Sequence, residues 1–92
     1  MRIARSCFVA GRVQGVYYRA STRQKALELG LAGFAKNLPD GRVEVLVAGS
    51  APQVEALIKW LWQGPPTSHV TDVVVREVPP DEITDAVRFV CL

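Results

Sequence analysis

Two parts of this 92-residue sequence hold residue types that could bind and transform an anion. The first is the segment GRVQGVYYR at residues 11–19, where Gly11 and Gly15 permit sharp turns that bring backbone N–H groups onto one concave surface. A helix that follows the segment would point its N-terminus toward that surface, and a helix N-terminus favours negative charge. Arg19 adds a planar set of donors that matches a phosphate or a carboxylate. The segment therefore predicts an oxyanion-binding loop, with a phosphoryl group as the best-fitting anion.

The second part is Asn37, which immediately precedes a Leu-Pro-Asp-Gly turn at residues 38–41. Its amide could accept a hydrogen bond from a water molecule while donating one to a substrate. An amide cannot remove a proton from water, so the expected role is orientation rather than general base catalysis. Both candidates also have a purely structural interpretation. Arg19 would then be a solvated arginine at a helix start, and Asn37 a turn residue that bonds to the local backbone.

The elements that would position these residues follow from hydrophobic patterns and turn residues. Serine and glutamine at capping-box spacing predict helix starts at Ser21 and Ser50, and glycines predict the helix ends at Gly30 and Gly64. Apolar residues on both faces of the first strand indicate a central position in a sheet. Apolar runs predict strands over residues 3–10, 33–38, 42–48, 70–78 and 86–91. The second helix carries one apolar stripe, formed by Val54, Leu57, Ile58 and Leu61.

The predicted order of elements is βαββαβ with a short extra strand at the C-terminal end. Two helices of about ten residues cannot cover both faces of a sheet, so they are expected on one face of an antiparallel sheet. This arrangement is the α+β, ferredoxin-like split βαβ sandwich. We expect residues 1–92 to form a single domain, because the chain is short and shows no internal repeat.

Composition narrows the functional classes. A net charge of +2 suits a small anionic substrate but is too weak to indicate nucleic-acid binding. No run approaches the roughly 20 apolar residues of a membrane span, and the N-terminal residues do not resemble a signal peptide, so we expect a cytoplasmic protein. Cys7 and Cys91 lie near opposite ends, and free thiols are favoured over a disulfide between them. No Cys/His cluster indicates a metal site.

Taken together, the two segments resemble the two signatures of the acylphosphatase family, in order and at the family's spacing. The matching residues are GRVQGVYYR at 11–19, GFAKNLPDGRVE at 33–44 and the later Gly49, and the resemblance covers essentially the whole chain. The sequence departs from the common pattern at Phe34 and Ala35, where tryptophan and valine are frequent. Its last residues, 89–92, lack the family's arginine–aromatic ending, so the resemblance does not fix the pairing of the last strand.

The resemblance implies an enzyme that hydrolyses acyl phosphates, the mixed anhydrides of carboxylic and phosphoric acids. It implies that Arg19 clamps the phosphate and that Asn37 holds the attacking water. It also implies a monomer that uses neither a metal, a cofactor nor a protein nucleophile, with inorganic phosphate as product or inhibitor. The backbone amides expected to complete the phosphate site are those of Gln14, Gly15, Val16, Tyr17, Tyr18 and Arg19.

Two other functions remain open at this point. Acylphosphatase-like domains also occur in larger carbamoyl-transferring proteins, so the chain could be a non-catalytic module that binds phosphate or acyl phosphate. The presence of both Arg19 and Asn37 favours the enzyme. An RNA-binding domain can share the same layout, but it stacks bases on aromatic residues of the sheet. The first strand offers only Phe8 for that purpose, so nucleic acid is not an expected partner.

Overall fold

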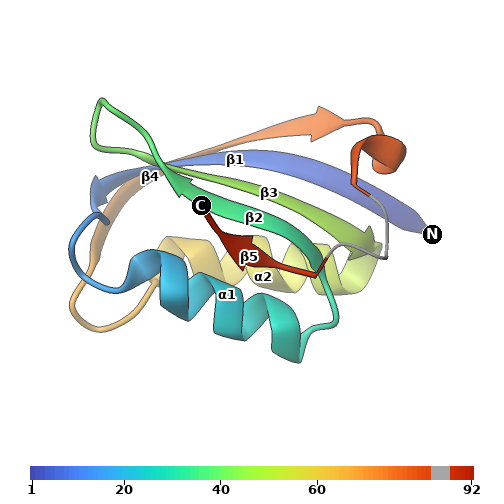
Figure 1. The fold of residues 1–92 in the computed structure, drawn as a ribbon, viewed down its shortest axis with the longest axis horizontal. Helices are drawn as coiled ribbons and strands as arrows, with labels where there is room; N and C mark the ends of the chain where they lie inside the picture. The colour runs from blue at the N-terminus through green and yellow to red at the C-terminus, as the bar shows by residue number, and fades with distance from the viewer. Residues whose placement is uncertain (84–87) are drawn as a thin grey trace.

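The computed structural model describes residues 1–83 and 88–92 and arranges them as strands and helices along one curved sheet (Figure 1). Residues 86 and 87 of the last predicted strand lie outside the described residues. The other predicted elements are present, with shifted ends. The elements are β1 (Arg2–Arg12), α1 (Tyr18–Glu28), β2 (Ala32–Asn37), β3 (Val43–Ser50), α2 (Ala51–Gln63), β4 (His69–Val78), the 3-10 turn η1 (Pro80–Glu82) and β5 (Val90–Cys91).

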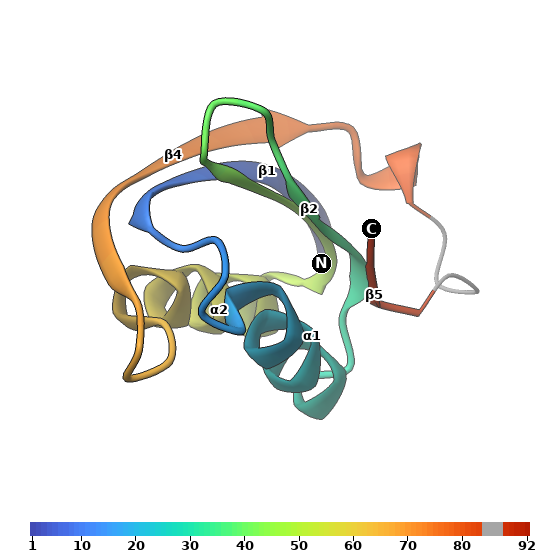
Figure 2. The same ribbon diagram turned by 60° about the vertical axis from the view of Figure 1, so that its left-hand side comes forward.

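The strand order in the sheet is β4-β1-β3-β2-β5. β1 lies between β4 and β3 and pairs antiparallel with both, which confirms its predicted central position. Both helices lie on one face of the sheet, as Figures 1 and 2 show, so the ferredoxin-like prediction is confirmed. The sheet is mixed rather than wholly antiparallel, because β5 runs parallel to β2, with Ala35 beside Cys91. This pairing brings the C-terminal residues next to the strand that ends in Asn37.

The core lies between the sheet and the two helices. Three residues of the predicted α2 stripe, Val54, Leu57 and Leu61, are fully buried, and Ile58 is half-buried. They face β1 and β3 residues that are also fully buried, such as Cys7 and Val45. Burial of each valine or leucine side chain contributes on the order of 1.5–3 kcal/mol relative to exposure. This packing holds both helices, and therefore the N-terminus of α1, at a fixed position against the sheet.

The start of α1 differs from the prediction at Ser21. The helix begins at Tyr18, and the Ser21 N–H already donates to the Tyr17 carbonyl at 3.0 Å, so Ser21 lies inside the helix and caps nothing. The reason is burial, because Tyr18, Thr22 and Ala26 form a buried stripe that begins one turn earlier than the capping-box pattern suggests. At α2, Ser50 does occupy the N-cap position, but its side chain makes no capping hydrogen bond. Arg19 is therefore a first-turn residue of α1.

β1 is also longer than predicted, because Gly11 belongs to the strand. A bulge lies between Ala10 and Gly11, where the register with β4 shifts. Gly11 has φ 119°, and a Cβ atom there would lie 2.1 Å from the carbonyl oxygen of His69, so only glycine fits. The connection between β1 and α1 is thereby reduced to residues 13–17, which we call the β1–α1 loop. Among residues 1–83 and 88–92, no helix is long and apolar enough to cross a membrane.

Candidate active site

The β1–α1 loop leads into an N-terminus of α1 that no side chain caps. Gly15 and Tyr17 have φ 74° and 63°, and Tyr17 is the one non-glycine residue with positive φ in the described part of the chain. A tyrosine held in this left-handed region stores strain that tends to mark functional sites. The Tyr17 side chain makes no capping bond, and the first turn of α1 contains no acidic residue. The N–H groups at this helix end therefore favour an external anion.

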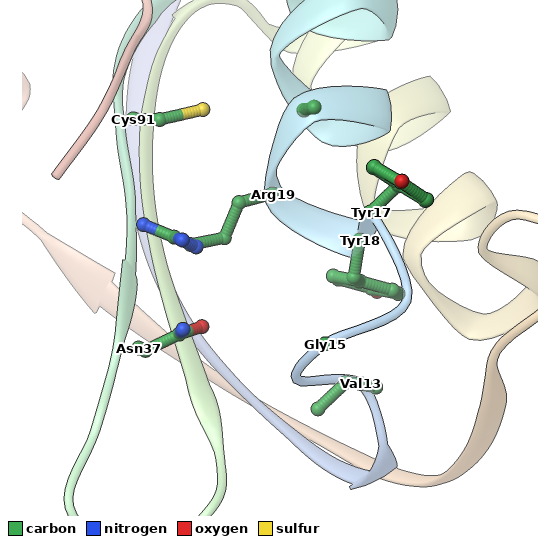
Figure 3. A pocket seen from close by; sticks show the side chains of 8 residues that line it. Val13, Gly15, Tyr17, Tyr18, Arg19, Asn37 and Cys91 are labelled. Carbon is green, nitrogen blue, oxygen red and sulfur yellow. The ribbon is translucent and has the colours of Figure 1, made fainter.

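A cavity of about 410 Å³ opens between this helix end and the strands β2 and β5 (Figure 3). The structure thus brings Arg19 and Asn37, which are 18 residues apart in sequence (37 − 19), into one pocket. It also places three of the predicted loop residues there. The lining residues are Val13, Gly15, Tyr17, Tyr18, Arg19, Ala20, Asn37 and Cys91.

Arg19 extends from α1 toward the strands, as Figure 3 shows. Its Nη1 donates to the main-chain oxygen of Leu92, whose own N–H donates to the Ala35 carbonyl at 2.8 Å. The end of β5 therefore helps to position the guanidinium. A cation in the first turn of a helix is unfavourable by about 0.3–1 kcal/mol unless negative charge lies nearby. An anion in the pocket would be attracted by both the guanidinium and the helix N-terminus.

Asn37 ends β2, and its side chain points from the strand toward the β1–α1 loop (Figure 3). Its Oδ1 is buried and accepts no hydrogen bond from any described residue. A buried acceptor without a partner costs about 1–3 kcal/mol, so a native structure keeps such an atom for a reason. The structural interpretation of Asn37 as a turn residue expects this oxygen to accept from the local backbone, and it does not. The oxygen is placed to accept from a molecule in the pocket.

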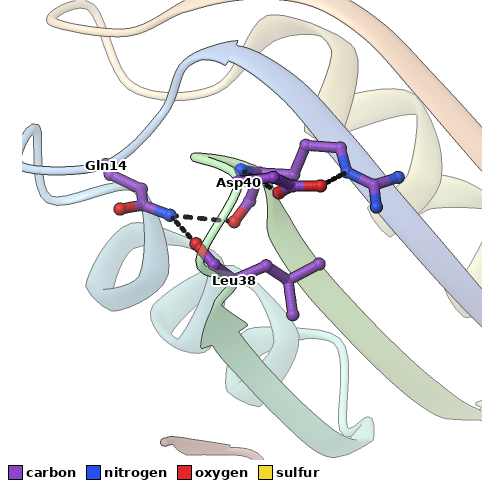
Figure 4. Close-up of polar contacts among 4 residues, drawn as sticks. Gln14, Leu38 and Asp40 are labelled. Carbon is purple, nitrogen blue, oxygen red and sulfur yellow. Dashed lines mark hydrogen bonds and ion pairs between the residues drawn. The ribbon is translucent and has the colours of Figure 1, made fainter.

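Two predicted loop residues, Gln14 and Val16, have side chains that do not line the pocket. Gln14 Nε2 donates to the Leu38 and Arg42 carbonyls at 2.8 and 3.0 Å (Figure 4). The Val16 side chain is buried, and its carbonyl accepts from Thr67 Oγ1 at 2.8 Å. These contacts hold the loop in place. The predicted use of the Gln14 and Val16 backbone amides in anion binding stays a prediction.

Tyr18, which also lines the pocket, anchors the first turn of α1 to α2. Its hydroxyl donates to the Leu61 carbonyl at 2.6 Å, and its ring lies 6.0 Å from that of Trp60. Burial raises the pKa of Tyr18, and the nearby Cys7 thiol raises it further, so the phenol stays protonated and remains a donor. The helix end that carries Arg19 is therefore fixed to α2.

The titratable groups near the pocket do not supply an acid or a base. None of the described residues that line it is a carboxylate or a histidine. Asp40 lies in the β2–β3 turn, where bonds from the Arg42 N–H and guanidinium hold the pKa of this carboxyl below its ordinary value. Within the described part of the chain, no group of three or more His, Cys, Asp or Glu side chains is arranged to hold a metal ion. The described lining of the pocket therefore offers hydrogen-bond donors and one guanidinium, but no carboxylate or imidazole.

Cys91, Val13 and Ala20 line the pocket although the sequence did not indicate them. Val13 lies inside the GRVQGVYYR segment and Ala20 directly follows it, so the segment itself could have indicated both. Cys91 reaches the pocket only because β5 pairs with β2, and a two-residue parallel strand has no distinctive sequence pattern. Both cysteines are free thiols, as expected, with Cys7 buried and Cys91 exposed.

Comparison with known proteins agrees with this geometry. The family model for acylphosphatase matches residues 5–90. The chain belongs to the acylphosphatase family. A curated acylphosphatase from Nitrosococcus oceani is 58% identical over 77 residues, which cover 84% of this chain and 86% of that protein. The solved structure of an acylphosphatase from Coxiella burnetii superposes with a TM-score of 0.90 at 36% identity, covering 99% of this chain and 93% of that chain. The prediction of an acylphosphatase enzyme is thereby confirmed.

A third match concerns a much longer protein. A full-length HypF, solved in a phosphate- and nucleotide-bound form, contains a region that superposes on 100% of this chain with a TM-score of 0.87 at 29% identity. That region is 12% of the HypF chain. The acylphosphatase fold therefore also serves as a small part of a larger protein, in contrast to the Nitrosococcus and Coxiella acylphosphatases, which this chain covers almost completely.

Proposed function

We propose that this chain hydrolyses acyl phosphates to a carboxylate and inorganic phosphate, with Arg19 and the loop amides of residues 14–19 binding the phosphoryl group and Asn37 orienting the water. One observation carries the proposal. A single pocket contains a guanidinium beside an uncapped helix N-terminus and, on the facing strand, the buried and unpartnered Asn37 Oδ1. The guanidinium and the helix N-terminus suit a phosphoryl group, and the Asn37 oxygen suits a water molecule next to it.

Binding would neutralise the charge on the phosphoryl oxygens. The left-handed conformations of Gly15 and Tyr17 turn the chain sharply before α1, which directs successive N–H groups to one side. The guanidinium has five N–H donors, so Arg19 can keep its bond to Leu92 and still bind two phosphoryl oxygens. Donors fixed in this way stabilise charge without having to reorganise during the reaction.

The bond that breaks is the one between phosphorus and the acyl oxygen. The oxygen of water attacks phosphorus, the P–O bond to the carboxylate breaks, and the carboxylate leaves with the bonding electrons. A carboxylate is a weak base, so no strong acid has to protonate it, which agrees with a pocket that lacks one. The proton of water passes to a phosphoryl oxygen. Asn37 Oδ1 accepts a hydrogen bond from the water and places it in line with the leaving group.

The experiment is to mix the purified chain with benzoyl phosphate or acetyl phosphate and follow the loss of acyl phosphate and the release of inorganic phosphate. We expect equal amounts of carboxylate and phosphate at a rate far above that of the uncatalysed reaction. The HypF match supports the alternative, a module that binds phosphate or acyl phosphate without cleaving it. Binding of inorganic phosphate with no turnover of any acyl phosphate would support the module and contradict the enzyme. Monomeric state and cytoplasmic location stay predictions from the sequence.

A further inference from the structure

We propose that Gln14 is a positioning residue, which fixes the distance between the phosphate-binding loop and Asn37 by donating both hydrogens of its side-chain amide to the turn that follows Asn37. This inference rests on the proposed function. It gives the Gln14 side chain a task that is separate from the backbone amide predicted for the same residue.

The two carbonyls that accept from Gln14 lie directly beside Asn37. Leu38 follows Asn37 in the chain, and its oxygen is 2.8 Å from Gln14 Nε2. Arg42 precedes Val43, which is the cross-strand partner of Asn37, and its oxygen is 3.0 Å from the same nitrogen. The amide therefore reaches both arms of the β2–β3 hairpin next to the Asn37–Val43 pair. Figure 4 shows its two hydrogen bonds.

The turn and the loop are each held together without Gln14. Within the turn, the Leu38 N–H donates to the Arg42 carbonyl at 2.8 Å, and the Gly41 N–H donates to the Leu38 carbonyl at 3.1 Å. The loop is tied to other parts of the fold by the Thr67 bond to Val16. In the part of the chain that the structure describes, only Gln14 makes hydrogen bonds between the β1–α1 loop and the turn. Gln14 therefore adds a direct hydrogen-bonded link between the loop and the turn, beyond the pairing of β1 with β3 that ends at Val9 and Val43.

This link affects the reaction more than it affects binding. Phosphate binding uses the loop and Arg19, which lie on one side of the link. Attack by water also requires the Asn37 oxygen on the other side, at a separation that must be kept within a fraction of an ångström. Misplacement by about 1 Å can lower a rate about 100-fold. Loss of the link should therefore reduce kcat while leaving the affinity for inorganic phosphate largely intact.

The test compares Gln14→Met and Gln14→Glu with the wild-type chain. Both variants preserve the length of the side chain and remove its N–H donors. With benzoyl phosphate as substrate, we expect kcat to fall about 10- to 100-fold in both, while the inhibition constant of inorganic phosphate changes by less than about threefold in Gln14→Met. A normal inhibition constant also shows that the variant is folded.

Thr67→Val is the matched control, because it removes a bond that holds the loop but does not reach the turn. We expect it to weaken phosphate binding at least as much as it lowers kcat. Wild-type kcat in Gln14→Met would overturn the inference, and so would equal losses of kcat and phosphate affinity. If the wild-type chain cleaves no acyl phosphate, the proposed function itself fails. If it does and Gln14→Met is fully active, only the role of Gln14 fails.

Discussion

Arg19 and Asn37 are the two side chains whose chemistry is most directly tied to the pocket. Both were predicted from their type and from neighbouring glycine and turn residues, because such local signals depend on few contacts. The bonds made by the Gln14 side chain were not predictable, since they join residues 24 and 28 positions apart in sequence and depend on how the hairpin packs. The exposed Cys91 was missed for the same reason. Residue types indicated the chemistry, and the tertiary fold determined the supporting contacts.

Replacement of Arg19 should lower activity without unfolding the protein. In the proposed mechanism Arg19 donates to the phosphoryl group in both ground and transition states, so we expect Arg19→Ala to lower kcat/KM by about 10²–10³ or more. Arg19→Lys is the control, because it retains the charge but not the planar pair of donors, and its loss should be smaller. Steady-state kinetics with benzoyl phosphate measure both, and circular dichroism checks the fold. An Arg19→Ala variant with wild-type kcat/KM would exclude the assigned role.

The two thiols should react very differently. Cys91 is exposed and lines the pocket, whereas Cys7 is fully buried and burial raises its pKa to about 12. Because the thiolate is the reactive form, we expect only Cys91 to react with a disulfide reagent in the native protein at about pH 8, and both thiols after unfolding. A bulky group on Cys91 should lower kcat/KM. The Cys91→Ser variant should show no reactive thiol in the native state, and rapid reaction of Cys7 there would contradict the burial argument.

At the scale of single elements, the start of α1 shows where sequence patterns are insufficient. Ser21 and Gln24 have the spacing of a capping box, yet the helix begins earlier because Tyr18 is more strongly buried. The Leu61 carbonyl explains why Tyr18 is held there. In a continuing helix the Leu61 carbonyl would accept from the N–H four residues later, but that residue is Pro65, which has no N–H. The Tyr18 hydroxyl donates to this carbonyl instead, at 2.6 Å. The helix that carries Arg19 is thus fastened where α2 ends.

Loss of this hydroxyl should destabilise the fold. Tyr18→Phe leaves the buried Leu61 carbonyl without a partner, so we expect the free energy of unfolding to fall by about 1–3 kcal/mol. Tyr17→Phe is the matched control, because Tyr17 is 81% exposed and its hydroxyl should contribute less than about 0.5 kcal/mol. Urea denaturation of the two variants gives the comparison. Equal stability of Tyr18→Phe and wild type would show that the bond to Leu61 is not stabilising.

At the scale of the whole molecule, the layer arrangement was predictable because two short helices with one apolar stripe each can cover only one sheet face. The α2 stripe, with Val54, Leu57 and Leu61 buried, followed directly from helical periodicity. The parallel direction of β5 could not be predicted from the sequence, because strand direction depends on the path of the preceding chain rather than on residue pattern. That direction matters for the site because it brings Leu92 to Arg19.

The buried core predicts a loss of stability in alkali. The pKa of Cys7 is raised from 9.0 to about 12 by burial, and burial also raises the pKa of Tyr18. The thiol and the phenol bind their protons more tightly in the folded protein than in the unfolded chain. Their contribution to the free energy of unfolding is therefore complete below their unfolded pKa values and is lost as pH rises above those values. The free energy of unfolding should therefore be flat near neutral pH and fall above about pH 9, by about 1.4 kcal/mol per pH unit for each titrating group.

Denaturation at a series of pH values measures this dependence, and Cys7→Ala is the control. That variant lacks the thiol, so its free energy of unfolding should fall less steeply than that of the wild type between about pH 9 and pH 10, where Cys7 titrates first in the unfolded chain. Identical slopes for Cys7→Ala and wild type would contradict the contribution assigned to the buried thiol.

The central claim is that the loop and Arg19 bind the phosphoryl group while Asn37 acts on the water. The most direct test is the Asn37→Ala variant, with kcat for benzoyl phosphate and the inhibition constant of inorganic phosphate measured on the same sample. We expect kcat to fall about 100-fold or more while the inhibition constant stays within about threefold of the wild-type value. Equal losses in turnover and phosphate affinity, or an Asn37→Ala variant with wild-type turnover, would contradict the central claim.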